Sequence, residues 1–181
     1  MRGSPKYVII TYMDNKHNGS PDASSDVAQW AWAAGFFDGE GTVGVQKNHS
    51  KTSKNPSFSL KVKVSQDDSY PLEKIKVMVG AGAICKYVRI RERKGKMQQE
   101  THYSYEVTGT PAKMFLQGML PFLTVKKKRA EFGIKFREMI ESRKNTGCKP
   151  LTPEQVEEGK QYYLLMKNLN KPKVVACSSN D

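Results

Sequence analysis

The chain has 181 residues, enough for one domain, and its 30 Lys and Arg outnumber 18 Asp and Glu, which gives a formal net charge of +12. So large a positive excess favours a polyanionic partner: DNA, RNA or an anionic membrane surface. No apolar run approaches the ~18–20 residues of a membrane-spanning helix, and the apolar patch at 7–10 is too short for the core of a signal peptide. The basic residues also lie along strand-like segments rather than on one amphipathic helix, so we expect no membrane partner and an intracellular protein. The cysteines and histidines do not stand at zinc-ligand intervals, which argues against a structural zinc site.

The N-terminal segment, residues 1–23, is expected to be a flexible arm, because it is rich in Gly, Ser, Pro and Asn and has little to bury. Ser24, Ser25 or Asp26 can cap a helix that is predicted to run from 27 to 38. That helix is expected to end at Gly39-Glu40-Gly41, where glycines permit backbone angles that other residues resist.

From 42 to 108 the apolar residues recur with a period of two, which predicts strands. The expected strands span 42–48, 58–66, 83–91 and 102–107. Hairpin tips are expected at 48–56 and 93–100. A short helix is predicted at 70–79, ended by Gly80-Ala81-Gly82.

The second half of the sequence is helical. A helix at 112–120 is predicted to follow a cap at Thr110 with Pro111 at its first position. Pro121 breaks it, and a longer helix at 127–143 follows. Thr152-Pro153 opens the last helix, to about 170, with Gln155 placed as in a capping box. The tail 171–181 is expected to be loose. The predicted class is therefore α+β: a single domain at 24–170 with an αββαββα core, a four-stranded antiparallel sheet and C-terminal helices on its other face.

The first helix has one face of small side chains. Ala28, Ala31, Gly35 and Asp38 fall at i, i+3, i+7 and i+10 and so share this face. The opposite face carries bulky residues that can anchor the helix in its own subunit: Val27, Trp30, Ala34 and Phe37, with Trp32 and Phe36 beside them. Small side chains let two helix backbones approach closely. We therefore expect this helix to pair with a second copy of itself.

The C-terminal end of the same helix is acidic. Asp38 ends the helix, and Glu40 follows after one glycine. Mg²⁺ takes oxygen ligands, usually one or two carboxylates with phosphate and water, and the free carbonyl of Gly39 could complete such a set. Two paired helices would bring two Glu40 carboxylates and their metals close together. That arrangement suits in-line attack of water on a phosphodiester.

Residues 33–41 resemble the signature of the LAGLIDADG homing endonucleases, with Ala33 at the usual Leu position and Glu40 at the last acidic position. The segment 121–130 and the helix–strand–strand–helix order also resemble this family, so the resemblance covers about 25–170. The motif occurs once, and in the family a single copy implies a homodimer.

The resemblance implies catalytic roles for three residues. Glu40 is expected to bind the metal together with the carbonyl of Gly39, Lys126 to lie near the scissile phosphate, and Gln66 to help hold a water network. Many relatives carry Arg or Lys shortly after the position of Gln66. This chain has acidic and neutral residues at 67–70, which leaves that basic role unassigned.

In the segment 42–107 basic residues outnumber acidic ones, and the alternation of side chains predicts a polar sheet face opposite an apolar one. Arg and Lys pair with guanine edges in the major groove, and Gln and Asn pair with adenine edges. The last strand is ambiguous, since His102, Ser104 and Glu106 oppose Tyr103, Tyr105 and Val107. The expected DNA-binding residues are Gln46, Asn48, Ser57, Ser59, Lys61, Lys63, Cys85, Tyr87, Arg89 and Arg91.

Taken together, the residues and the resemblance predict a site-specific endonuclease that cuts both strands of a long, pseudo-palindromic DNA target as a homodimer. Mg²⁺ is the expected cofactor, with Mn²⁺ as a substitute and Ca²⁺ supporting binding without cutting. A mobile-element role such as intron homing is implied by the resemblance, in an organelle (chloroplast or mitochondrion) or in bacterial or archaeal cytoplasm. Two alternatives stay open: a DNA-binding regulator of the same fold that does not cut, and a splicing helper that binds intron RNA.

Overall fold

The structure is a computed structural model that describes residues 8–9, 23–49, 55–93, 96–143 and 150–171. The described strands form one antiparallel sheet in the order β1-β4-β5-β3-β2. The elements are, in chain order, β1 (Val8–Ile9), α1 (Ala23–Glu40), β2 (Gly41–Asn48), β3 (Ser57–Gln66), α2 (Tyr70–Val79), β4 (Ala83–Arg93), β5 (Lys96–Thr108), α3 (Gly109–Met119), α4 (Lys127–Ser142) and α5 (Pro153–Leu169).

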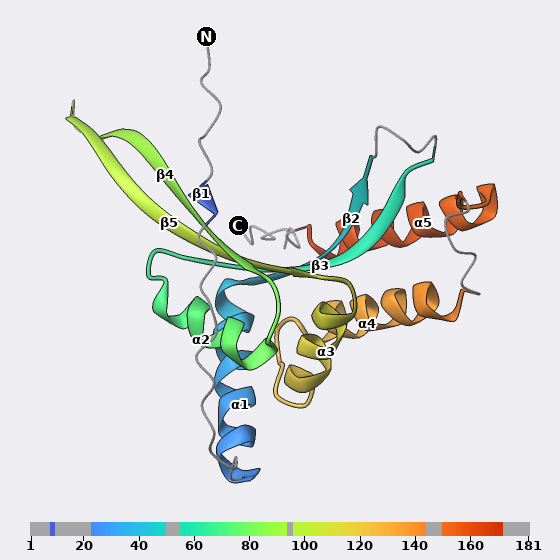
Figure 1. Cartoon of the computed structure of the whole chain (residues 1–181), viewed down its shortest axis with the longest axis horizontal. Coiled ribbons are helices and arrows are strands. Elements are labelled where there is room, and N and C mark those ends of the chain that lie inside the picture. The colour runs from blue at the N-terminus through green and yellow to red at the C-terminus, as the bar shows by residue number, and fades with distance from the viewer. Residues whose placement is uncertain (1–7, 10–22, 50–54, 94–95, 144–149, 172–181) are drawn as a thin grey trace, which may run out of the picture.

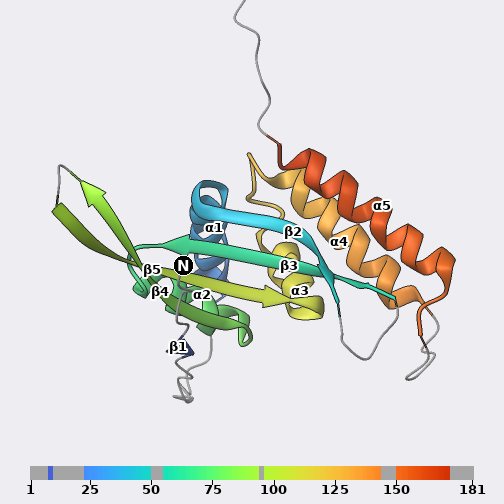
Figure 2. The ribbon, with the colours of Figure 1, turned by 90° about the horizontal axis from the view of Figure 1, so that it is seen from above.

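The five helices of the described residues lie on one face of the sheet, and the strand pairs β4–β5 and β2–β3 rise away from them on either side (Figure 1). The opposite face is therefore concave, and no described helix covers it. Seen from above, this face lies open in front of α1, α2 and α3 (Figure 2). Helix α1 projects away from the sheet with its C-terminal end at the sheet, where Glu40 leads directly into β2.

The alternation of side chains along β2 and β3 builds the two faces of the sheet. Val43 pairs with Val62 and Val45 with Leu60, and all four side chains are buried. The residues between them in sequence point to the open face, because successive side chains of a strand point to opposite sides. The expected period-two pattern is thus confirmed.

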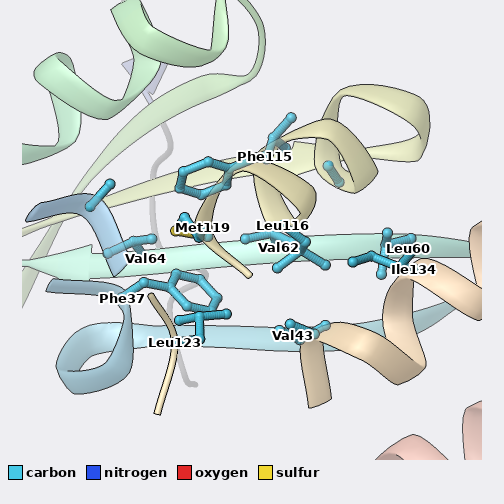
Figure 3. Packing of buried hydrophobic residues seen from close by; sticks show 14 of the residues in the cluster. Phe37, Val43, Leu60, Val62, Val64, Phe115, Leu116, Met119, Leu123 and Ile134 are labelled. Carbon is cyan, nitrogen blue, oxygen red and sulfur yellow. The ribbon is translucent and has the colours of Figure 1, made fainter. Parts of the chain in front are cut away.

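The core fills the space between the apolar sheet face and the helices (Figure 3). Phe115 of α3 stands at its centre, with ring contacts to Trp30 and Phe37 of α1 and to Tyr105 of β5 at centroid distances of 6.2, 6.0 and 6.3 Å. Such tilted and edge-on contacts are favoured between aromatic rings. Phe37 is the link between the core and the acidic end of α1, which follows it in sequence.

A glycine ends α2 and a capping box begins α5 where the sequence predicted. Gly80 has a φ of 66° and closes α2 through a hydrogen bond from its N–H to the carbonyl of Lys76, and Gly82 has a φ of 94°. Thr152 and Gln155 form the predicted capping box at the start of α5. At Gly41, in contrast, the expected reason for glycine is wrong: its φ is not positive, and a Cβ there would collide with the ring of Phe37.

The order and the type of the predicted elements are confirmed, but some of the boundaries are wrong. Strand β5 begins at Lys96, so most of the hairpin tip expected at 93–100 is strand. Helix α3 begins at Gly109 with Thr108 at the N-cap, so Thr110 is not the cap. The two-residue strand β1 lies within the expected N-terminal arm and pairs with β4 at Cys85 and Lys86. None of the helices among the described residues is long and apolar enough to cross a membrane.

Helices α1 and α3 are close enough to make Gly118 a test of the packing. A Cβ at Gly118 would lie 2.6–2.7 Å from three atoms of the Trp30 indole. Gly118→Ala is therefore expected to lower the free energy of unfolding by about 1–3 kcal/mol through overpacking, although alanine favours a helix. Urea denaturation followed by tryptophan fluorescence measures this change.

The control for this substitution is Gln117→Ala, which changes the exposed neighbour on the same helix. It is expected to shift the free energy of unfolding by about 0.5 kcal/mol or less. A Gly118→Ala protein more stable than the wild type would contradict the described approach of α3 to Trp30.

Candidate functional site

The carboxylate of Asp38 joins the end of α1 to the loop that precedes α4. It accepts hydrogen bonds from the backbone N–H of Thr124, Val125 and Lys126 at 2.8, 3.1 and 2.8 Å. The Thr124 hydroxyl donates a fourth, at 2.8 Å. Burial by itself would raise the pKa of Asp38, but these hydrogen bonds outweigh it and hold the pKa below its usual value.

The side chain of Lys126 makes the reverse connection. Its Nζ donates to the carbonyls of Phe37, Asp38 and Gly39 at 2.9, 2.7 and 3.1 Å, and the residue is only 7% exposed. A cation is favourable there, because the last carbonyls of a helix lack intrahelical partners and carry partial negative charge. Burial is the main cause that lowers the pKa of Lys126, with Arg129 adding to it and Asp38 and Glu40 opposing it.

Asp38 and Lys126 together form what we call the reciprocal clamp. The carboxylate binds the loop before α4, and the ammonium binds the end of α1, so each element holds the other in place. Glu40 follows one residue after the carbonyl of Gly39 and is exposed. The clamp therefore fixes the backbone on which the exposed carboxylate stands.

Asp38 belongs to the helix face predicted to pair with a second copy, and it is half-buried within its own chain. Its hydrogen bonds give it a structural role that the helical pattern did not indicate. Lys126 was placed near a scissile phosphate by resemblance, and the structure brings it to the carbonyl of Gly39, the expected metal ligand.

The end of α1 fits a divalent ion that is only partly held by one protein chain. Among the described residues, no three His, Cys, Asp or Glu side chains gather into a metal site. One chain offers the exposed carboxylate of Glu40 and the carbonyl of Gly39. A carbonyl oxygen has two lone pairs, so that of Gly39 can accept the hydrogen bond from Lys126 and also bind a metal ion. Oxygen donors of this kind suit Mg²⁺, which keeps waters and binds phosphate.

Gln66 is the last residue of β3 and lies at the same end of the sheet as Glu40. The register pairs Gly41 with Val64, so Gln66 extends two residues beyond this pair, toward the end of α1. Its Oε1 accepts a hydrogen bond from the N–H of Asp67 at 2.8 Å, which leaves the amide NH₂ as its donor group. The expected role of Gln66 with water stays a prediction.

The residues predicted to contact DNA lie on the concave face, as far as their side chains are described. The register aligns Gln46 with Ser59 and Asn48 with Ser57, and the amide of Asn48 donates to the Ser59 hydroxyl at 2.9 Å. Arg89 is exposed. The side chain of Arg91 lies outside the described residues. The same face also carries Lys61, Lys63, Cys85 and Tyr87, each of them half-buried.

The register of β5 resolves the ambiguous strand and reveals residues that the sequence pattern missed. Ser104 pairs with Cys85 and Ser65, so His102, Ser104 and Glu106 share the concave face. His102 stacks on Tyr87 with a centroid distance of 5.7 Å, and its Nδ1 contacts the carboxylate of Asp67. The centre of this face therefore mixes positive and negative side chains.

The small face of α1 is open in the single chain. Ala28, Ala31 and Gly35 are exposed, and a Cβ added to Gly35 would meet no atom within 4 Å. The expected anchoring by the other face is confirmed for Trp30, which contacts Phe115. It is wrong for Val27, which is 55% exposed.

The other anchoring residues behave as expected. Ala34 and Phe37 are fully buried. Trp32 and Phe36 stack on each other at 5.7 Å, and Lys74 of α2 lies 4.2 Å from the Trp32 ring. Two faces of α1 thus hold it in its own chain, while the small face remains uncovered.

Comparison with protein families shows which class this arrangement represents. A sequence model described as LAGLIDADG endonuclease matches residues 33–141, which span the end of α1, the strands β2 to β5 and most of α4. The matched segment includes Glu40, Gln66 and Lys126. The chain therefore belongs to the LAGLIDADG endonuclease family. A comparison with the sequences of curated proteins found no match.

Solved structures with the same fold fall into two groups by length. The homing endonuclease I-CvuI, in complex with I-CreI target DNA in the presence of Mg, is 20% identical with a TM-score of 0.61, and the match covers 83% of this chain and 87% of that one. I-CvuI with its own target in the presence of Ca gives a TM-score of 0.60. The archaeal intron-encoded homing endonuclease I-Vdi141I, complexed with DNA, is 17% identical with a TM-score of 0.58, covering 80% and 85%.

The second group has longer chains. The LAGLIDADG homing endonuclease I-GzeII, in complex with its DNA target, is 18% identical with a TM-score of 0.52, and the match covers 77% of this chain but 43% of that one. One copy of the fold thus corresponds to nearly the whole of the chains in the first group and to less than half of the I-GzeII chain.

Removing the negative charge of the reciprocal clamp is expected to destabilise the protein. In Asp38→Asn the new NH₂ group faces the N–H donors of residues 124–126, which lose their charged acceptor. We expect the free energy of unfolding to fall by about 1–3 kcal/mol, as for other partly buried hydrogen bonds to a charged group. Chemical denaturation at fixed protein concentration measures it.

Asp26→Asn is the control, because Asp26 is an exposed acid in the first turn of the same helix. Its effect is expected to be about 0.5 kcal/mol or less. Equal losses in the two variants would show that the carboxylate of Asp38 does not hold the loop before α4.

Proposed function

We propose that the protein is a site-specific double-strand DNA endonuclease that cuts a long, pseudo-palindromic target as a homodimer with a divalent metal. The observation that carries the proposal is the exposed carboxylate of Glu40, held by the reciprocal clamp at one end of an open, polar sheet face. Family membership supplies the reaction class, and the DNA in the complexes of similar fold supports duplex DNA as the substrate.

The homodimer is supported by the open face of α1 and by the single copy of the motif and of the fold in this chain. The small face of α1 is uncovered in the single chain, as a helix that pairs with a second copy requires. The motif at 33–41 occurs once in the sequence. The chain also matches nearly the full length of I-CvuI and I-Vdi141I. A two-fold dimer would present two copies of the same site to the two strands of the target, which accounts for its proposed pseudo-palindromic sequence.

The metal is proposed to be Mg²⁺, bound by Glu40 and the carbonyl of Gly39 together with water and DNA phosphate. When bound, such an ion supplies Lewis-acid stabilisation of charge on the phosphate oxygens. The chain itself contributes position: Lys126 fixes the carbonyl of Gly39, and Asp38 fixes the loop that carries Lys126. Mn²⁺ is proposed to substitute, and Ca²⁺ to support binding without cutting.

The concave face is proposed to lie in the DNA major groove. Gln46, Asn48, Ser59 and Arg89 offer donors and acceptors suited to base edges. The width of a two-stranded ribbon suits the major groove, and β4–β5 and β2–β3 are two such ribbons, one on each side of the face (Figure 1).

Loss of the Glu40 charge is expected to separate cutting from binding. Glu40→Gln removes the carboxylate ligand, so cleavage of library-selected duplex targets in Mg²⁺ should fall by at least about a hundredfold. Binding to the same targets in Ca²⁺ should persist. Gel assays of cleavage and of mobility measure the two effects.

Glu138→Gln, at an exposed acid of α4, is the matched control and should retain cleavage. Wild-type protein that binds duplex DNA but never cuts it would favour the alternative function, a DNA-binding regulator of the same fold. Wild-type protein that binds only structured RNA would favour the splicing helper.

The helix pair can be tested by adding bulk to the small face. Ala31→Leu has room in the single chain, because Ala31 is exposed, but it overpacks a close helix–helix contact. We expect the dissociation constant of the dimer to rise by roughly tenfold or more, with cleavage falling in parallel. Analytical ultracentrifugation measures the dissociation constant.

The matched control is Gln161→Leu, which places the same side chain at an exposed position of α5. It should leave the dimer intact. The homodimer is ruled out by wild-type protein that is a stable monomer both alone and on DNA.

A further inference from the structure

The centre of the concave face holds an ion-pair cluster that no predicted role accounts for. Glu106 of β5 contacts two lysines of the neighbouring strand β3: Lys61 Nζ lies 2.6 Å from its Oε2, and Lys63 Nζ lies 3.5 Å from its Oε1. Both lysines were predicted to contact DNA, and Glu106 lies on the same face, directly opposite Lys63 and diagonal to Lys61.

The cluster is partly shielded from solvent. The side chains of Glu106, Lys61 and Lys63 are 32%, 28% and 41% exposed. Burial alone would raise the pKa of Glu106, but the hydrogen bond and charge of Lys61 and the charge of Lys63 hold it below its usual value. Glu106 is therefore ionised at neutral pH, and both lysines lie against its carboxylate while remaining partly exposed to solvent.

Negative groups continue along the same face. Asp67 contacts His102, and Glu100 Oε2 lies 3.6 Å from His102 Nε2. The chain as a whole has a net charge of +12, yet the centre of its concave face is close to balanced. A surface whose only task is to attract phosphate would leave its lysines unpaired, since affinity for DNA comes from the release of counterions by free cations.

We propose that Glu106 is a specificity-determining residue. By pairing with Lys61 and Lys63 it keeps their charge from DNA phosphates, so that the centre of the concave face discriminates between DNA sequences by base-edge contacts. This inference rests on the proposed function, because it requires the concave face to bind duplex DNA. A paired lysine gains little from a phosphate, since the nearby carboxylate repels the same phosphate and must be desolvated with it. Base edges carry no net charge, so donors and acceptors on the paired groups can still read them.

The test compares the salt dependence of binding to a random-sequence DNA duplex, in Ca²⁺ so that no cutting occurs. In Glu106→Gln the two lysines become free to bind phosphates, and each new phosphate contact steepens the slope of log K against log salt by about 0.9. We expect the slope to steepen by one or two such steps of about 0.9, one for each lysine that gains a phosphate contact. Each corresponds to roughly eightfold tighter non-specific binding at ~0.1 M salt. The preference for a target selected by the wild type from a library should fall by the same factor.

Glu141→Gln is the matched control. Glu141 also contacts two cations, Lys113 and Arg137, but it lies on α4 on the helical side of the molecule. The substitution removes the same formal charge, so any effect of net charge alone appears equally in both variants. The proposal requires Glu106→Gln to steepen the slope more than Glu141→Gln does.

Lys61→Gln in the otherwise wild-type protein provides a second measurement, which does not depend on the folding of the Glu106 variant. In the wild type it should change the slope by less than half of the ~0.9 expected for a lost phosphate contact, because Lys61 is already paired. In the Glu106→Gln background it should reduce the slope by about one full step.

Three outcomes overturn the proposal. The first is an equal salt-dependence slope for Glu106→Gln and Glu141→Gln. The second is a slope that falls by the full ~0.9 of one phosphate contact when Lys61→Gln is made in the wild type. Weaker binding of Glu106→Gln to the selected target with unchanged random-duplex binding would make Glu106 a direct base contact instead. These results leave the endonuclease intact, whereas wild-type protein that binds no duplex at all overturns the proposed function as well.

Discussion

The reciprocal clamp between Asp38 and Lys126 is the interaction on which the rest of the site depends. The two residues are 88 positions apart, and each satisfies backbone groups at the end of the other's element. Because Lys126 is buried and Asp38 is half-buried, losing either partner would leave polar groups short of hydrogen bonds, which costs more than losing a surface ion pair. It couples the packing of α4 to the position of Glu40. A substitution that shifts α4 would therefore reach the candidate metal ligand through these hydrogen bonds.

Most of the fold could be predicted from the sequence, because its signals are local. The period-two runs predicted β2, β3 and β4 to within two residues, and Pro153 with the Thr152–Gln155 pair predicted the start of α5. The clamp could not be predicted, since an Asp in the last turn of one helix and a lysine before a later helix carry no signal that they meet. The face of β5 was ambiguous for a similar reason. His102 and Tyr103 alternate equally well either way, and only the pairing of Ser104 with Cys85 and Ser65 decides which set is exposed.

The structure differs from what the composition indicated mainly in where the charged side chains lie. The net charge of +12 and the excess of basic residues in the segment 42–107 indicated a basic sheet face, yet Lys61 and Lys63 are paired with Glu106. Net charge determines the long-range attraction of a polyanion, and this attraction does not depend on where each lysine points. Contacts at the centre of the face depend on local pairing instead. The two properties can be tuned separately, because exposed cations on the helices, such as Lys127 and Lys128 of α4, add to the net charge but do not lie on the sheet.

The open face of α1 follows from the same choice of residues that suits it for pairing. Leaving Ala28, Ala31 and Gly35 exposed costs little, since their side chains present almost no apolar area to water. By the same reasoning, burying them in a dimer gains little from the hydrophobic effect. The stability of the proposed helix pair must then come from close backbone approach and from the partners at its ends, as it does where small residues line helix contacts in membranes. A dimer held in this way is strengthened by a ligand that binds both copies at once. A two-half-site DNA target is such a ligand, so target binding and dimer formation are expected to reinforce each other.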